Sequence, residues 1–235
     1  MNVADATSQA FSLLLTGDAE LWQIIWVSLK TSLIALSLAS APAILGAYLI
    51  ASYQFRGRRF LIFLIQACLS LPTVLIGLLL YLLLSRQGAL GSLHWLFAQT
   101  GIIAGQVFIA LPVLTAFALS AIQSADTRLA ETAISLGANR WRVMCTVLYE
   151  VRFGIMSAII YGFGRVLSEV GCAMMVGGNI AGETRTITTA IALETSKGEF
   201  TQGIALGLVL ITLALIMNAA LMLLQGDARL ATNHL

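Results

Sequence analysis

Five long apolar stretches alternate with short polar connections along the chain. They cover about residues 24–51, 60–84, 101–123, 153–178 and 203–225. A helix of about 20 predominantly apolar residues is long enough to cross the hydrocarbon core of a bilayer. The pattern therefore predicts an all-helical, polytopic membrane bundle with five transmembrane helices.

Prolines fall inside the first three stretches, at Pro42, Pro72 and Pro112. A proline removes one backbone hydrogen bond from a helix and allows it to bend, although membrane helices also carry prolines for packing alone. Each of these positions is therefore a candidate bend.

The spans form one membrane domain between two short terminal segments. Residues 1–20 would lie outside the cytoplasm, either as a short helix on the membrane surface or as an irregular lead-in. Residues 21–226 hold the five spans together with the long 124–152 connection, and residues 227–235 form a tail.

The basic residues are distributed unequally between the two sides of the predicted bundle. One side carries eight arginines in two connections and the tail, namely Arg56, Arg58, Arg59, Arg128, Arg140, Arg142, Arg152 and Arg229. The other side carries three basic residues, Arg86, Arg185 and Lys197. Because Lys and Arg favour the cytoplasmic side, the N-terminus is predicted outside and the C-terminus in the cytoplasm.

Composition supports the membrane assignment and excludes other classes of protein. Hydrophobic residues make up 59% of the chain and charged residues 10%, against about 25% charged in soluble domains. The net charge of +2 supplies no basic surface for nucleic acid, so nucleic-acid binding is not expected.

The residues needed for catalysis or metal binding are missing. Neither Lys30 nor Lys197 lies in a phosphate-binding GxxxxGK motif, so this chain is not expected to be an ATPase or another enzyme. His94 and His234 have no neighbours at metal-ligand spacing. No catalytic or metal site is predicted, and the cysteines are interpreted as packing residues, at Cys68, Cys145 and Cys172.

The 124–152 connection is the most informative segment. Its first part places apolar residues at helical spacing with charged residues on the remaining surface. Gly137 allows the first helix to stop, and a second helix is predicted to begin near Asn139. Two amphipathic helices joined at a glycine suit docking into a groove on another protein, while a connection lying on the membrane surface remains an equal alternative.

The connection contains Glu131-Thr132-Ala133, then Gly137-Ala138 and the apolar Val147. In these residues it resembles the EAA loop of permease subunits of binding-protein-dependent, type I ABC importers. Thr132 replaces an alanine of the pattern, and Tyr149-Glu150 replaces its closing Leu-Pro. The resemblance implies an ATPase-coupling role for about residues 128–142, including Arg128, Glu131, Thr132, Ala133, Leu136, Gly137, Ala138 and Arg140.

Three further runs extend the resemblance to nearly the whole chain. Residues 71–91, 164–180 and 184–200 are similar to the oxyanion branch of these permeases, and the last run most resembles tungstate permeases. Molybdate and sulfate remain alternative substrates because their tetrahedral dianions have similar shapes. The alternative from a different functional class is a membrane scaffold, which would bind a partner protein without transporting a substrate.

The resemblance also implies partners and a mechanism. The chain would sit in a bacterial or archaeal inner membrane as a pair, most simply a homodimer, with two cytoplasmic ABC ATPases and an external oxyanion-binding protein. ATP and Mg would bind to the ATPases, with no cofactor in this chain. ATP binding would then drive alternating access through the coupling segment.

Arg165 and Glu169 stand four residues apart in the fourth predicted span, where they can form an ion pair. Charges at membrane depth are costly unless paired or hydrated. The pair is either a structural lock or a part of the translocation path in which Arg165 briefly balances a dianion. Ser70 and Thr73 are likewise either packing residues or donors to a passing oxyanion.

The outer segment 179–200 is rich in threonine and charged residues. In the family this segment lies near the docking surface of the binding protein. Contact with that partner and a solvated loop explain its charges equally well.

Overall fold

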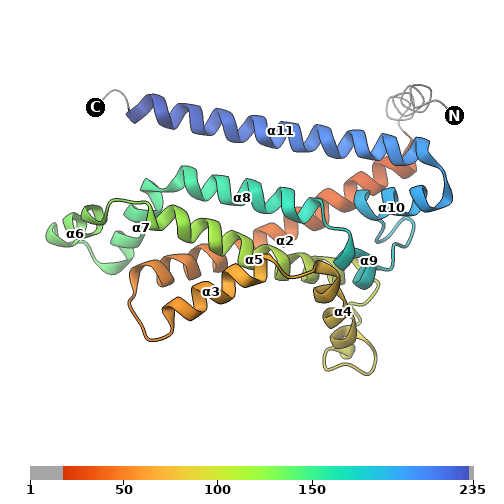
Figure 1. Ribbon diagram of the computed structural model, residues 1–235, viewed down its shortest axis with the longest axis horizontal. Coiled ribbons are helices and arrows are strands. Elements are labelled where there is room, and N and C mark those ends of the chain that lie inside the picture. The colour runs from red at the N-terminus through yellow and green to blue at the C-terminus, as the bar shows by residue number, and fades with distance from the viewer. Residues whose placement is uncertain (1–17, 233–235) are drawn as a thin grey trace.

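The computed structural model describes residues 18–232, apart from the side chains at positions 127, 220–221 and 224–232. Most of the predicted lead-in and the last three residues of the tail lie outside this range. Within it the chain is helical throughout (Figure 1). The helices are α2 (Ala19–Ser52), α3 (Arg58–Leu69), α4 (Thr73–Leu84), the short η1 (Gly91–Leu93), α5 (Gln99–Gln123), α6 (Thr127–Ser135), α7 (Arg140–Glu150), α8 (Arg152–Leu167), α9 (Gly171–Gly177), α10 (Ile187–Lys197) and α11 (Phe200–Thr232).

The number of apolar helices agrees with the predicted bundle. Three of the described helices are long and apolar enough to cross a membrane alone: α2, α5 and the first part of α11. Two bent helix pairs bring the total to as many as five spans. The expected all-helical, multi-span fold is confirmed.

The second predicted span, 60–84, is not one continuous helix. Helices α3 and α4 meet at an angle of 98° across residues 70–72. Pro72 occupies the N-cap of α4, where its missing N–H removes no helical hydrogen bond. Pro42 and Pro112, in contrast, lie inside the unbroken helices α2 and α5.

The fourth predicted span, 153–178, is also divided. Helix α8 ends at Leu167 and the short α9 begins at Gly171, so Glu169 lies in the link between them and not within a helix. At its other end α8 is bent by 69° relative to α7. The break falls at Ser168-Glu169-Val170, and the apolar residues on both sides of it made the stretch resemble one span.

The core lies where α2, α5 and α8 meet. Its central cluster contains Leu36, Ala39 and Ala43 of α2, Ala110 and Leu114 of α5, and Val166 of α8. The alanines allow the helix backbones to approach closely, as small residues do in membrane bundles. Gly162 has the same role, since a Cβ there would lie 2.8 Å from Leu114 Cδ2.

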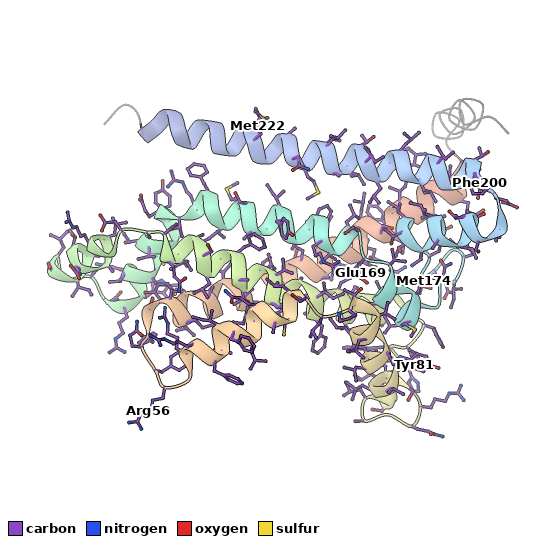
Figure 2. All side chains as sticks on the ribbon, viewed as in Figure 1. Arg56, Tyr81, Glu169, Met174, Phe200 and Met222 are labelled. Atoms are coloured by element: carbon purple, nitrogen blue, oxygen red, sulfur yellow. The ribbon has the colours of Figure 1, made fainter. Side chains whose placement is uncertain are left out.

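The two ends of the bundle differ in composition. The α2–α3 connection, α6 and α7 gather at one end, together with the C-terminal end of α11 (Figure 1). Arg56 projects from this end, whereas Phe200, at the start of α11, lies at the opposite end (Figure 2). The structure therefore collects the arginine-bearing connections on one side, which is the arrangement that the orientation prediction requires.

Candidate functional site

Helices α6 and α7 form a compact hairpin whose ends are capped by the sequence itself. Asp126 accepts a hydrogen bond from the backbone N–H of Arg128 at 2.9 Å, and Asn139 accepts one from Arg142 N–H at 2.9 Å. Such side-chain caps satisfy donors that have no partner within the helix. The local sequence thus determines where both helices begin.

The turn between the two helices depends on Gly137. Its φ is +80°, in the left-handed region that favours glycine, and no heavy atom lies within 4 Å of a Cβ placed there. The N–H of Ala138 reaches back to Ala133 O at 3.0 Å, closing the end of α6. The predicted glycine junction and the predicted start of the second helix are both confirmed.

One face of the hairpin is anchored in the bundle. Val143 and Val147 of α7 are buried against Ile50 of α2 and Ile122 of α5. The partly buried alanines of the coupling segment pack on the same cluster, at Ala130, Ala133 and Ala138. The hairpin is therefore in direct contact with two of the spans.

The other face of the hairpin presents apolar side chains to the outside. Leu136 is 83% exposed and Trp141 is 67% exposed, and Ile134 is exposed beside them. A hollow of about 480 Å³ lies between the helices. Its lining consists of Leu129, Thr132, Ala133, Leu136, Ala138, Arg142, Cys145 and Thr146. The polar members of the predicted coupling set, Arg128, Glu131, Thr132 and Arg140, are exposed around this face.

The predicted charged pair is formed. Arg165 Nη1 lies 3.0 Å from Glu169 Oε2, with the arginine side chain 33% exposed and the glutamate side chain 2% exposed. Glu169 Oε1 also accepts the N–H of Cys172 at 2.9 Å, and Glu169 O accepts Thr188 Oγ1 at 2.6 Å. Glu169 thus connects α8 to the start of α9 and to α10.

The two helix breaks lie side by side. A Cβ at Gly171 would meet Val74 Cγ2 at 2.5 Å, and one at Gly77 would meet Cys172 Cα at 2.8 Å, so α4 packs directly on α9. Thr73 and Arg165 line one cavity of about 420 Å³ next to these breaks. Ser70 is exposed and does not line that cavity, so of the two predicted hydroxyls only that of Thr73 lies beside the arginine.

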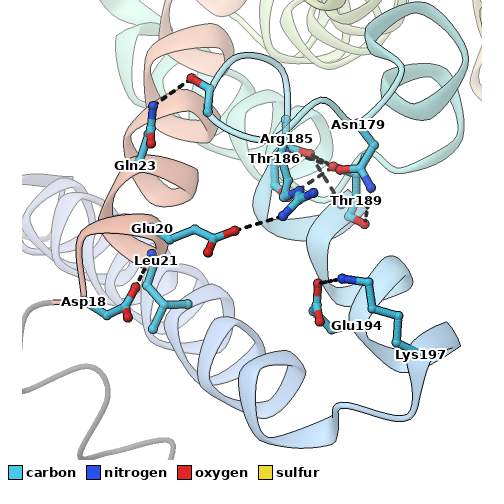
Figure 3. A network of polar contacts seen from close by, with 11 residues as sticks. Asp18, Glu20, Leu21, Gln23, Asn179, Arg185, Thr186, Thr189, Glu194 and Lys197 are labelled. Atoms are coloured by element: carbon cyan, nitrogen blue, oxygen red, sulfur yellow. Dashed lines mark hydrogen bonds and ion pairs between the residues drawn. The ribbon is translucent and has the colours of Figure 1, made fainter.

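A polar network closes the opposite end of the bundle (Figure 3). Arg185 Nη1 pairs with Glu20 Oε1 at 3.0 Å, and Gln23 Nε2 donates to Gly182 O at 2.7 Å. Gln99 Nε2 donates to Glu183 O at 2.8 Å. Sequence patterns did not identify Gln23 or Gln99 as functional residues. Their one distinguishing feature in the sequence is an amide next to apolar residues.

The outer segment is a folded element and not a solvated loop. Its threonines are buried, at Thr184, Thr186, Thr188 and Thr189, and the last three belong to the start of α10. Glu194 is also buried and is held by Lys197 Nζ at 3.0 Å. Lys197 therefore pairs with Glu194 Oε1 within the chain (Figure 3), while Glu194 Oε2 is buried without a hydrogen-bond partner.

Metal-binding chemistry finds no support in the described residues. Within 18–232 no group of three or more His, Cys, Asp or Glu side chains could hold a metal ion. The cysteines are free, with Cys145 exposed, Cys172 buried and Cys68 between these extremes.

The structure is a multi-span helical bundle with an apolar hairpin anchored at one end and with paired helix breaks beside a charged pair. Residues 43–229 match the family described as binding-protein-dependent transport system inner membrane component, and the chain belongs to that family. It is the inner-membrane permease of a binding-protein-dependent ABC importer and not the ATPase.

Individual relatives and solved structures agree with this assignment. The chain is 38% identical over 92% of its length, and 90% of the relative, to the tungstate uptake system permease protein TupB of Campylobacter jejuni. It is 31% identical over 85% of its length, and 90% of the relative, to the molybdenum transport system permease protein ModB of Escherichia coli. The fold matches a bacterial ABC transporter for alginate with a TM-score of 0.72 at 19% identity, covering 94% of this chain and 82% of the other.

Proposed function

We propose that this permease imports an oxyanion, tungstate first, into the cytoplasm. The observation that carries the proposal is the similarity to a tungstate uptake permease along 92% of the chain. Molybdate is the second candidate, because a molybdenum permease is related at 31% identity. The structural match to the alginate transporter supports the fold. At 19% identity it carries no information about the substrate.

The permease works as a pair, and exposed polar structure at membrane depth supports this part of the proposal. Residues 70–72 form a non-helical, exposed break in an apolar stretch, next to the Arg165 cavity. Irregular backbone is tolerated at membrane depth only where protein covers it or where it lines a water-filled cavity. A second copy of the chain across this face supplies that cover.

Two ATPases act through the α6–α7 hairpin, and an external binding protein delivers the anion. ATP and Mg bind to the ATPases and supply the work of transport. That work is needed because each negative charge entering a negative interior is opposed by about 2.3 kcal/mol per 100 mV. The exposed apolar face that includes Leu136 and Trp141 fits an ATPase cleft, and Val143 and Val147 carry its motion into the spans.

The proposed orientation can be measured with the native Cys145, which is exposed in the α6–α7 hairpin. A membrane-impermeant maleimide should label it in inside-out vesicles and leave it unlabelled in right-side-out vesicles. Cys145→Ser is the control that identifies the labelled position. Labelling of Cys145 from the outside would reverse the orientation.

The substrate is tested by reconstitution. Liposomes containing the permease, its ATPase and its binding protein should take up tungstate in an ATP-dependent manner, with molybdate as the competing substrate and sulfate as the third anion. Vesicles without ATP provide the baseline. Preferential uptake of molybdate or sulfate would show that this anion, and not tungstate, is the substrate. An assembled complex that moves none of the three anions would refute the oxyanion proposal and leave the scaffold alternative.

A further inference from the structure

Arg165 lies between two cavities of nearly equal size. One, of about 420 Å³, is bounded by α3, α4 and α5, and we call it the α3–α5 cavity. The other, of about 410 Å³, lies between α8 and α11, and we call it the α8–α11 cavity. Arg165 lines both, so an anion that approaches its guanidinium group can come from either side.

The two cavities differ in chemistry. Apart from Arg165, Thr73 and Cys68, the α3–α5 cavity is lined by aliphatic and aromatic residues and a proline. The α8–α11 cavity is lined by Tyr161, Ser168 and Asn218 in addition to Arg165. An anion leaving water loses its hydrogen-bond donors, and only the α8–α11 cavity offers several polar side chains to replace them.

These polar groups come from facing helices, and Tyr161, Ser168 and Asn218 are exposed along them. Arg165 lines the α3–α5 cavity together with Leu111 and Pro112, which lie at the centre of the 25-residue helix α5. Asn218 Nδ2 donates to Ala214 O at 2.9 Å, which leaves its second N–H for another acceptor. The Tyr161 ring lies 4.4 Å from that of Phe117, which positions the phenol beside the cavity. Polar side chains gathered at this depth are expensive and typically mark an ion or substrate path.

We propose that the α8–α11 cavity, and not the α3–α5 cavity, is the transit site at which the anion passes Arg165. The inference rests on the proposed import of an oxyanion. Arg165 supplies the positive charge, and Tyr161 and Asn218 supply neutral donors to the oxygens of a tetrahedral dianion. Because Glu169 already shares the guanidinium charge, the site binds weakly enough to release its anion, as conduction requires.

The first test compares matched variants of the two cavities in reconstituted complexes. Asn218→Leu and Tyr161→Phe each remove one donor to a charged group and should lower tungstate uptake by about tenfold. Cys68→Ser is the control for the α3–α5 cavity, which Cys68 lines, and should leave uptake unchanged. ATP hydrolysis stimulated by the loaded binding protein should persist in all three variants.

The second test measures access by water and does not depend on turnover. In a Cys68→Ser, Cys145→Ser background, Asn218→Cys should react with an anionic, lipid-insoluble thiosulfonate. Ile216→Cys, placed on the opposite face of α11 by helical periodicity, should react only with a lipid-soluble maleimide. Native Cys68, which lines the α3–α5 cavity, should also resist the anionic reagent in the Cys145→Ser chain.

The outcomes separate this inference from the proposed function. Normal uptake by Asn218→Leu and Tyr161→Phe, or loss of uptake in Cys68→Ser, overturns the transit site while leaving oxyanion import intact. Failure of the anionic reagent to reach Asn218→Cys overturns it independently, even if Asn218→Leu does not assemble. If the wild-type complex moves no oxyanion, the proposed function and the transit site fall together.

Discussion

Leu136→Asp is expected to abolish uptake without unfolding the permease. Leu136 is 83% exposed at the tip of the α6–α7 hairpin, and Gly137 follows it in a left-handed conformation that holds the tip in place. Truncating a central apolar anchor of an interface costs about 2 kcal/mol or more, and a buried carboxylate adds the cost of its desolvation. Uptake and binding-protein-stimulated ATP hydrolysis should therefore fall by about a hundredfold.

The permease itself should remain folded, because surface substitutions of this kind usually change stability by less than about 0.5 kcal/mol. Thermal unfolding of the purified permease and its co-purification with the ATPase are the two measurements. Leu136→Met is the matched control, since it keeps a flexible apolar side chain at the tip and should retain most uptake. A Leu136→Asp complex that couples ATP hydrolysis to uptake as the wild type does would contradict the assignment of this tip to the ATPase.

Glu169→Gln is expected to destabilise the permease severely. Both carboxylate oxygens of Glu169 are engaged, one by Arg165 and one by the N–H of Cys172, and the side chain is buried. The substitution leaves Arg165 without its counter-charge at membrane depth. Removing one partner of a buried ion pair costs about 3–5 kcal/mol, so the variant should lose a large part of its thermal stability.

The companion variants reveal how the pair divides its roles. Arg165→Gln combined with Glu169→Gln removes both charges and should recover part of the stability lost in Glu169→Gln, because no unpaired charge remains. Arg165→Gln alone keeps the bond of Glu169 to Cys172 but leaves the buried carboxylate without its counter-charge, so the variant should assemble with reduced stability and fail to take up anion. If Arg165→Gln also fails to assemble, the pair is purely a structural lock. Thermal unfolding and uptake, measured side by side, separate these cases.

The two halves of the charged pair therefore have different surroundings, although the sequence presents them as equivalents. Glu169 is enclosed by α9 and α10, with its carbonyl accepting Thr188 Oγ1. Arg165 is one-third exposed and faces two cavities. The helix break at 168–170 produces this difference, because it turns the glutamate towards the outer elements while the arginine stays on α8.

Local sequence determined several features of this protein without help from the rest of the fold. Apolar runs longer than a bilayer requires identified the membrane bundle, and Gly137 with Asn139 marked the junction of the coupling hairpin before the structure placed it there. Caps, turns and hydropathy act over a few residues, so a single sequence contains them in full. The resemblance to the EAA loop worked for the same reason, because its residues lie within one short segment.

Tertiary structure alone decided what depends on residues far apart in the chain. Pro72 had marked the second span as a candidate bend, but no local pattern contains the break of the fourth span or the packing of α4 on α9 through Gly77 and Gly171. Other features also depend on segments distant in sequence. These are the burial of Glu194, the hydrogen bonds of Gln23 and Gln99 to the outer segment, and the cavity that Asn218 and Arg165 both line. In an apolar chain the hydrophobic pattern shows which residues enter the membrane, but it is nearly uniform around each helix. Close packing between helices, and the few polar groups that must find partners, therefore determine which face of each helix points into the bundle.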